Sequence, residues 1–301
     1  MAGPTAPEAR GTDFRPPRIG VRRLNQDPPL SRRLTRPSEV RRLIRELDLR
    51  PSRGRGQNFL IDANILRCVI DSAGLEDGDG VLEIGPGLGA LTAGLLERGG
   101  RVTAIEKDGR LADHLRRLMP DRRALHVRTE DALETDFGEL FRASVCRVAA
   151  NLPYSVGTRI LVRIVDAEPR PETVAVMLQL ETARRIAAAP GSSDYGPLAV
   201  RTTAFFESAL VKTVSATCFY PRPEVRSAVL RLVRRDTPAI RSDAYPRLVE
   251  ILRSAFSQRR KKLSNTLPDL DLRAVGIDPE LRPHRVPPGD WYRLAERALH
   301  A

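Results

Sequence analysis

Short apolar runs alternate with amphipathic stretches between residue 61 and about residue 236. The runs are rich in β-branched or small apolar residues, and the stretches between them have helical spacing. The runs are residues 81–84, 102–105, 125–127, 147–150 and 174–178. This alternation predicts βαβ units and a parallel sheet, and two later runs, 209–215 and 227–233, predict closing antiparallel strands. We therefore expect an α/β, Rossmann-like fold.

The two ends of the chain have different patterns. Residues 1–36 are rich in Pro, Arg and Gly without an apolar period, which predicts a disordered basic tail. Helical apolar spacing then predicts a short helix over 38–48, at the start of a catalytic domain spanning 37–236. Helical periodicity and charge replace strand alternation in 237–301, so we expect a small helical domain there.

The composition restricts the kinds of binding partner and bound metal that we expect for this protein. Lys and Arg number 50 against 38 Asp and Glu, a net charge of +12, which favours a polyanionic partner. A genomic bias toward arginine is the alternative explanation of this charge. The three cysteines form no CxxC pair, so we expect neither a metal site nor a disulfide framework. No signal-peptide core or membrane-length apolar run is present, so we expect a cytoplasmic monomer without membrane contact.

A glycine-rich turn directly follows the first predicted strand. Gly85, Gly87 and Gly89 stand between that strand and a predicted helix, where backbone N–H groups can approach a ligand. Glu106 ends the second strand, in position to accept hydrogen bonds from ribose hydroxyls, and Asp131 follows the third, in position to accept from an adenine amine. These features in order predict a nucleotide-like cofactor, either NAD or S-adenosyl-L-methionine.

The fourth strand ends in a turn that carries the chemistry, Asn151-Leu152-Pro153-Tyr154. The exocyclic amine of adenine is a poor nucleophile because its lone pair is conjugated with the ring. Oxygen acceptors, the Asn151 side chain and a backbone carbonyl near Leu152, would orient that amine toward a methyl donor. Pro153 shapes the turn, and Tyr154 offers a face on which a base can stack. A plain strand-to-helix connection is the alternative.

From about Gly54 to its carboxyl end the chain resembles the KsgA family of ribosomal RNA adenine dimethyltransferases. Five segments in the family's order carry the resemblance: GQNFL at 56–60, EIGPGLGALT at 83–92, NLPY at 151–154, FYPRPEVRSAV at 219–229 and FSQRRKKLSNTL at 256–267. The resemblance implies dimethylation of two adjacent adenosines near the 3′ end of small-subunit (16S) ribosomal RNA within a pre-ribosomal particle. It implies S-adenosyl-L-methionine as the methyl donor.

The resemblance also implies roles for individual residues. Cofactor contacts would come from Asn58, Leu60, Gly85, Gly87, Glu106, Asp131 and Asn151. Tyr154, and with lower rank Phe219, would stack on a target adenine flipped out of the RNA. The basic residues Arg222, Arg259, Arg260, Lys261 and Lys262 would contact RNA phosphates, the last four as a basic run at a helix.

The sequence departs from the family pattern at two places, which bear on substrate fit, the extent of methylation and the charge near the RNA, and three further functions remain alternatives. Residues 155–157 are Ser-Val-Gly where the family more often has Asn, an apolar residue and Ser, and Glu224 stands where it usually has Lys. An Erm-type enzyme that methylates large-subunit RNA shares the catalytic turn. A non-catalytic RNA-binding or transcription factor could use the same fold, and an NAD-dependent oxidoreductase could use a similar glycine-rich turn.

The segment at 256–267 favours the small-subunit enzyme over the Erm type. The intact Gly85, Glu106, Asp131 and Asn151–Tyr154 turn argue against the non-catalytic factor. The GxGxG spacing and the lack of a hydride-transfer residue argue against the oxidoreductase.

Overall fold

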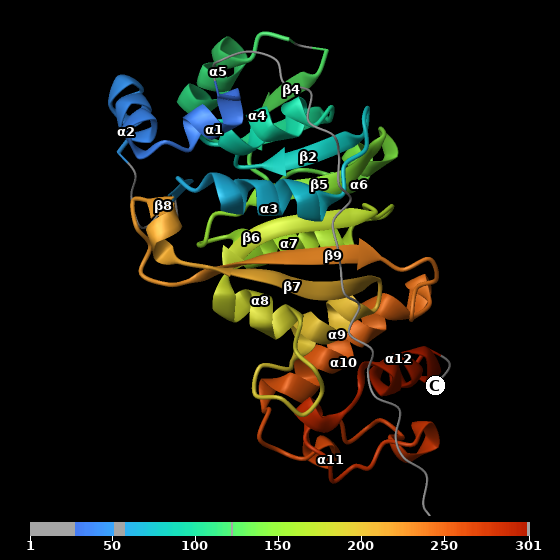
Figure 1. The fold of residues 1–301 in the computed structure, drawn as a ribbon. Coiled ribbons are helices and arrows are strands. Elements are labelled where there is room, and N and C mark those ends of the chain that lie inside the picture. Colours follow the sequence, from blue (N-terminus) through green and yellow to red (C-terminus); the bar gives the residue numbers. More distant parts are fainter. Residues whose placement is uncertain (1–27, 51–57, 122, 300–301) are drawn as a thin grey trace, which may run out of the picture.

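A seven-stranded sheet forms the centre of the molecule, in a computed structural model that describes residues 28–50, 58–121 and 123–299 (Figure 1). The strand order is β4-β3-β2-β5-β6-β9-β7. The strands are β2 (Gly80–Ile84), β3 (Arg101–Glu106), β4 (Leu125–Thr129), β5 (Val145–Asn151), β6 (Thr173–Gln179), β7 (Phe206–Val214) and β9 (Ser227–Arg234). The first five are parallel, and β9 runs antiparallel to both β6 and β7. The predicted α/β, Rossmann-like class and the antiparallel closing pair are confirmed.

Helices cover both faces of the sheet. One face packs on α3 (Ala63–Ala73), α4 (Ala90–Glu97) and α5 (Gly109–Leu118), and the other on α6 (Phe137–Arg142), α7 (Gly157–Asp166), α8 (Leu180–Ile186) and α9 (Pro197–Thr203). Successive residues of β5 alternate between the two cores: Val148 and Ala150 belong to one, and Ala149 to the other. A strand that is buried on both faces is apolar throughout, which is why a continuous apolar run predicted it.

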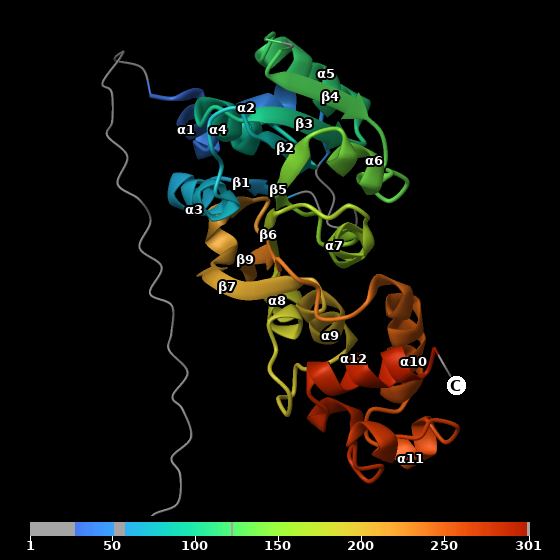
Figure 2. The ribbon, with the colours of Figure 1, turned by 90° about the vertical axis from the view of Figure 1, so that its right-hand side faces the viewer.

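Three further helices follow β9: α10 (Tyr245–Ser257), α11 (Leu263–Thr266) and α12 (Pro288–Arg297), with α10 and α12 packed side by side (Figure 2). Trp291 is fully buried, with its ring centroid 5.9 Å from that of Phe256. The apolar core is continuous from the sheet through α9 to Trp291, so this helical part shares its core with the catalytic part. No helix in the described part of the chain is long and apolar enough to cross a membrane.

The predicted disordered tail is wrong for its last residues. Residues 1–27 lie outside the described residues, but α1 (Leu30–Leu34) and α2 (Pro37–Glu46) are helices, the second close to the predicted helix 38–48. Leu34 is only 1% exposed, and Ser31 donates to the Glu97 carboxylate from its backbone N (3.0 Å) and its Oγ (2.6 Å). The order comes from burial against α4, which a segment with so few apolar residues does not reveal on its own.

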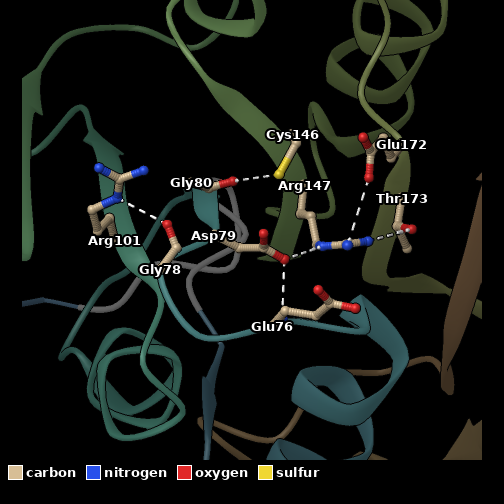
Figure 3. A network of polar contacts seen from close by, with 9 residues as sticks. All are labelled: Glu76, Gly78, Asp79, Gly80, Arg101, Cys146, Arg147, Glu172 and Thr173. Carbon is tan, nitrogen blue, oxygen red and sulfur yellow. Dashed lines mark hydrogen bonds and ion pairs between the residues drawn. The ribbon is translucent and has the colours of Figure 1, made fainter.

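A polar network joins the amino ends of β2, β5 and β6, at the edge of the sheet opposite the glycine-rich turn (Figure 3). Arg147 donates from Nε to Asp79 Oδ2 (2.6 Å) and from Nη1 to Thr173 Oγ1 (3.3 Å), and its Nη2 lies 3.6 Å from Glu172 Oε2. Its side chain is 14% exposed. Because the guanidinium is largely out of water, these partners replace its hydration.

We expect Arg147→Met to lower the free energy of unfolding by about 1–3 kcal/mol, because it leaves Asp79 without its guanidinium partner. Arg101→Met is the matched control: Arg101 is exposed and its side chain donates from Nε to the Gly78 carbonyl (2.9 Å), so its loss should cost about 0.5 kcal/mol or less. Urea unfolding of both variants measures the difference. Equal losses would contradict the structural role of Arg147.

Candidate active site

A cavity of about 740 Å³ opens where the strand order reverses, at the carboxyl ends of β2 and β5. Chain connections leave in opposite directions at this point of an open parallel sheet, which creates a crevice for ligands. The cavity is lined by residues from the ends of β2, β3 and β5, from the segment after β4, and from the N-terminal helices. Its volume suits a nucleoside-sized ligand.

The glycine-rich turn forms one wall of this cavity. Gly87 has φ +58°, and a Cβ on it would lie 3.1 Å from the Phe59 ring. Both the left-handed backbone and the close approach require glycine there. Gly89, with φ +88°, is the N-cap residue of α4, so the helix begins immediately beside the cavity. Gly85 also lines the cavity, as do Asn58 and Leu60, the other residues of the predicted cofactor set on this side.

Two predicted acidic residues face the same cavity from neighbouring strands. Glu106 is 7% exposed and accepts hydrogen bonds from the backbone N–H groups of Gly87 (3.1 Å) and Asp108 (2.9 Å). Burial raises the pKa of Glu106. Asp131 accepts from Lys107 Nζ (2.7 Å) and from the Leu133 N–H (2.9 Å), and the bond from Lys107 lowers the pKa of Asp131. The sequence reasoning missed Lys107, which directly follows Glu106.

The turn after β5 enters the cavity beside the glycine-rich turn. Asn151 donates from Nδ2 to the Asn58 carbonyl (3.0 Å), which leaves its Oδ1 on the other branch of the amide. The Leu152 N–H donates to the Met177 carbonyl (3.0 Å). The Pro153 carbonyl accepts from the N–H groups of Val156 (3.2 Å) and Gly157 (2.7 Å), so it is engaged at the start of α7. The departure at residues 155–157 thus still gives a helix beside the site.

The two predicted stacking residues occupy different environments. Tyr154 lines the cavity, and its hydroxyl is hydrogen-bonded to Ser227 Oγ. Phe219 lies 6.5 Å from Tyr154 between ring centroids, edge to face at 73°, and is only 2% exposed. It belongs to the apolar core and is not among the residues that line the cavity. The structure therefore places Phe219 as a support for Tyr154, against the prediction of direct stacking on a base.

Comparison with known proteins identifies the family. The model of the family described as Ribosomal RNA adenine dimethylase matches residues 52–298. The chain belongs to this family. Among curated relatives, a protein of Opitutus terrae named ribosomal RNA small subunit methyltransferase A is 39% identical over 275 residues, covering 87% of this chain and 98% of the relative. One of the same name from Moorella thermoacetica is 40% identical over 264 residues, 82% of this chain and 92% of the relative.

Solved structures agree with this membership. A dimethyladenosine transferase from Plasmodium falciparum superposes with a TM-score of 0.67 over 80% of this chain and 98% of that one; at 24% identity it supports the fold alone. The 23S rRNA methyltransferase ErmE has a TM-score of 0.63 and 30% identity, over 80% of this chain and 99% of its own. The predicted resemblance is confirmed, and the protein is an rRNA adenine methyltransferase by family.

The basic residues predicted to bind RNA lie in two parts of the fold. Arg222 is exposed after β8 (Phe219–Tyr220), which pairs with β1 (Phe59–Leu60). The basic run at 259–262 lies between α10, which ends at Ser257, and α11, whose N-cap residue is Lys262, so it adjoins a helix without forming part of one. Arg259 donates to the Ser192 carbonyl (3.2 Å) and Lys262 pairs with Glu280, while Arg260 and Lys261 are exposed.

Glu83 begins the glycine-rich segment at 83–92, but no role was predicted for it from the sequence. Glu83 lines the cavity yet is only 1% exposed. Burial, with a smaller contribution from Glu106, raises the pKa of Glu83 to about 8. Thr92 lies beside the carboxylate, but neither oxygen has a partner in good hydrogen-bonding geometry among the described residues. An acidic residue one position before the end of a buried strand was the available signal.

The high pKa makes stability depend on pH. Folded Glu83 keeps its proton to about pH 8, whereas the unfolded carboxyl ionises near 4.5, so the folded state binds more protons in between. The free energy of unfolding should therefore fall as pH rises across this interval. We expect the stability of Glu83→Gln relative to wild type to grow by about 1–3 kcal/mol from pH 5 to pH 8, measured by urea unfolding of ligand-free protein.

The exposed Glu134→Gln is the control for this pH series. Its stability curve should stay parallel to that of the wild type. A Glu83→Gln curve that is also parallel to wild type would show that Glu83 is ionised in the folded protein.

Proposed function

We propose that the protein transfers methyl groups from S-adenosyl-L-methionine to N6 of two adjacent adenosines near the 3′ end of small-subunit ribosomal RNA. The observation that carries this proposal is that the Asn151–Tyr154 turn and the glycine-rich turn open into one cavity. The methyl donor and the acceptor amine can then meet without any movement of the sheet. The enzyme acts as a cytoplasmic monomer on a pre-ribosomal particle in this proposal.

The acidic residues of the cavity fit the methyl donor. Glu106 is held rigidly by two backbone donors and suits the ribose hydroxyls, and Asp131 suits the adenine amine. Glu83 is a buried carboxyl with no well-aligned partner in the described part of the chain, which suits the ammonium of the methionine part. When bound, S-adenosyl-L-methionine supplies an electrophilic methyl on a positively charged sulfur.

The catalytic turn positions the acceptor amine. Asn151 is anchored through its Nδ2, so its Oδ1 can accept from one hydrogen of the adenine amine. The Pro153 carbonyl is engaged by α7, so the Leu152 carbonyl is the candidate for the second acceptor. Tyr154, fixed by Ser227 and Phe219, supplies the stacking face. These contacts hold the amine lone pair in line with the methyl group.

The choice of the small subunit follows from the relatives. Two relatives named for the small subunit are 39% and 40% identical to this chain, compared with 30% for ErmE, which is named for 23S rRNA. The exposed Arg260 and Lys261 belong to the segment that resembles the small-subunit enzymes and are available for phosphate contacts. Retention of Asn151 and Tyr154 in the cavity favours catalysis over a binding role.

Transfer of labelled methyl groups to isolated small subunits, large subunits and protein-free 16S RNA tests the proposal. We expect incorporation into small subunits, with N6,N6-dimethyladenosine as the product on mass spectrometry. Incorporation only into large subunits would establish the Erm-type function. The absence of incorporation into any of them would establish a non-catalytic role.

Substitutions in the catalytic turn separate the hydrogen bonds to the adenine amine from the stacking on the adenine ring. We expect Asn151→Ala to lower kcat by about 10²–10³-fold, because one acceptor of the amine hydrogens is lost. Tyr154→Ala should also lower kcat strongly, whereas Tyr154→Phe keeps the ring and should stay within about tenfold of wild type. Single-turnover methyl transfer at saturating cofactor measures each effect. Equal losses for the two Tyr154 variants would assign the tyrosine's role to its hydroxyl.

A further inference from the structure

The helices α1 and α2 line the cavity although they precede the part of the chain that the family model matches, residues 52–298. Leu34 at the end of α1 and Val40 in α2 are both among the lining residues, and each is only 1% exposed. These two side chains therefore belong to the buried wall of the cavity. Figures 1 and 2 show α1 beside α4, whose amino end starts at the glycine-rich turn.

The wall that contains Leu34 and Val40 is apolar. Leu88, Leu91 and Leu111, from the glycine-rich turn, α4 and α5, line the same cavity and belong to the same hydrophobic core. Glu106, the candidate ribose acceptor, lies shortly before α5. Apolar side chains on this side would exclude water from a bound nucleoside and strengthen the hydrogen bonds that Glu106 makes with it.

Two arginine contacts attach α2 to the rest of the site. The Arg41 guanidinium carbon lies 6.0 Å from the ring centroid of Tyr220, in the strand that also carries Phe219. Arg110 donates from Nη1 to the carbonyl of Asp48, two residues beyond the end of α2 (2.8 Å), and from Nη2 to Asp108 Oδ2 (3.0 Å). The middle of α2 thus contacts the strand that carries Phe219, and the segment after α2 is tied to the segment that follows Glu106.

We propose that α1 and α2 form an apolar wall that retains the cofactor in its cavity, and that the contacts of Arg41 and Arg110 keep this wall in place. The inference rests on the proposed function for the identity of the cofactor. It assigns Leu34 and Val40 to the buried apolar layer of the wall that holds the cofactor. Arg41 acts as a positioning residue through α2.

Val40→Phe tests the wall directly, because its larger ring would enter the cavity where the cofactor lies. We expect the Kd for S-adenosylhomocysteine, measured by calorimetry, to rise about tenfold or more, together with a fall in Tm because the added volume strains the core. Leu43→Ala is the matched control: Leu43 is buried in α2 but does not line the cavity. It should lower Tm and leave the Kd within about twofold of wild type.

Arg41→Met tests the wall without changing the cavity lining. Loss of the cation–π contact should speed cofactor dissociation about three- to tenfold, while the Kd for small subunits in the absence of cofactor stays unchanged. Arg45→Met removes an equal charge from the same helix and should leave the dissociation rate at the wild-type value.

Unchanged cofactor binding by Val40→Phe, or an equal loss in Leu43→Ala, would overturn the wall while leaving the proposed function intact. A wild-type protein that binds neither S-adenosylmethionine nor S-adenosylhomocysteine would overturn the proposed function, and this inference with it.

Discussion

The parallel pairing of β2 with both β3 and β5 is the constraint on which the rest of the site depends. Ile84 is the residue of β2 that lies opposite Ile105 on one side and Ala150 on the other. The residues that follow Ile84, Ile105 and Ala150 are Gly85, Glu106 and Asn151. Three groups far apart in the sequence therefore lie together at one edge of the sheet. Parallel strands align their carboxyl ends, and a shift in register would separate these groups.

The buried ionisable groups at the two ends of the strands differ in whether the protein supplies them with partners. At the amino edge, Arg147 is paired with Asp79 and bonded to Thr173, so its desolvation is compensated within the protein. At the carboxyl edge, Glu83 is buried without a well-aligned partner among the residues that the structure describes, and its pKa is correspondingly high. A buried polar group without a partner lowers the stability of the ligand-free protein. A ligand that supplies the missing hydrogen-bond partner restores that stability.

The predictable parts of the fold were those with local signals. The buried strands appeared as apolar runs, the glycine-rich turn as residues that tolerate positive φ, and the catalytic turn as Asn151 to Tyr154. Other parts depended on distant contacts. The helix α1 is ordered by α4, and Phe219 turned out to support Tyr154 from the core. The basic run at 259–262 lies in a turn because α10 ends at Ser257.

The sequence by itself therefore determined the order of strands and helices along the chain, the residues at the strand ends and the family, because each depends on a local pattern or a short motif. Only the tertiary structure decided which side chains share the cavity. Leu34 and Val40 entered it because helix packing set their direction, and Glu83 acquired its high pKa because the surrounding core removed water. An apolar run indicates that a segment is buried, but which distant residues surround it depends on the packing of the assembled chain.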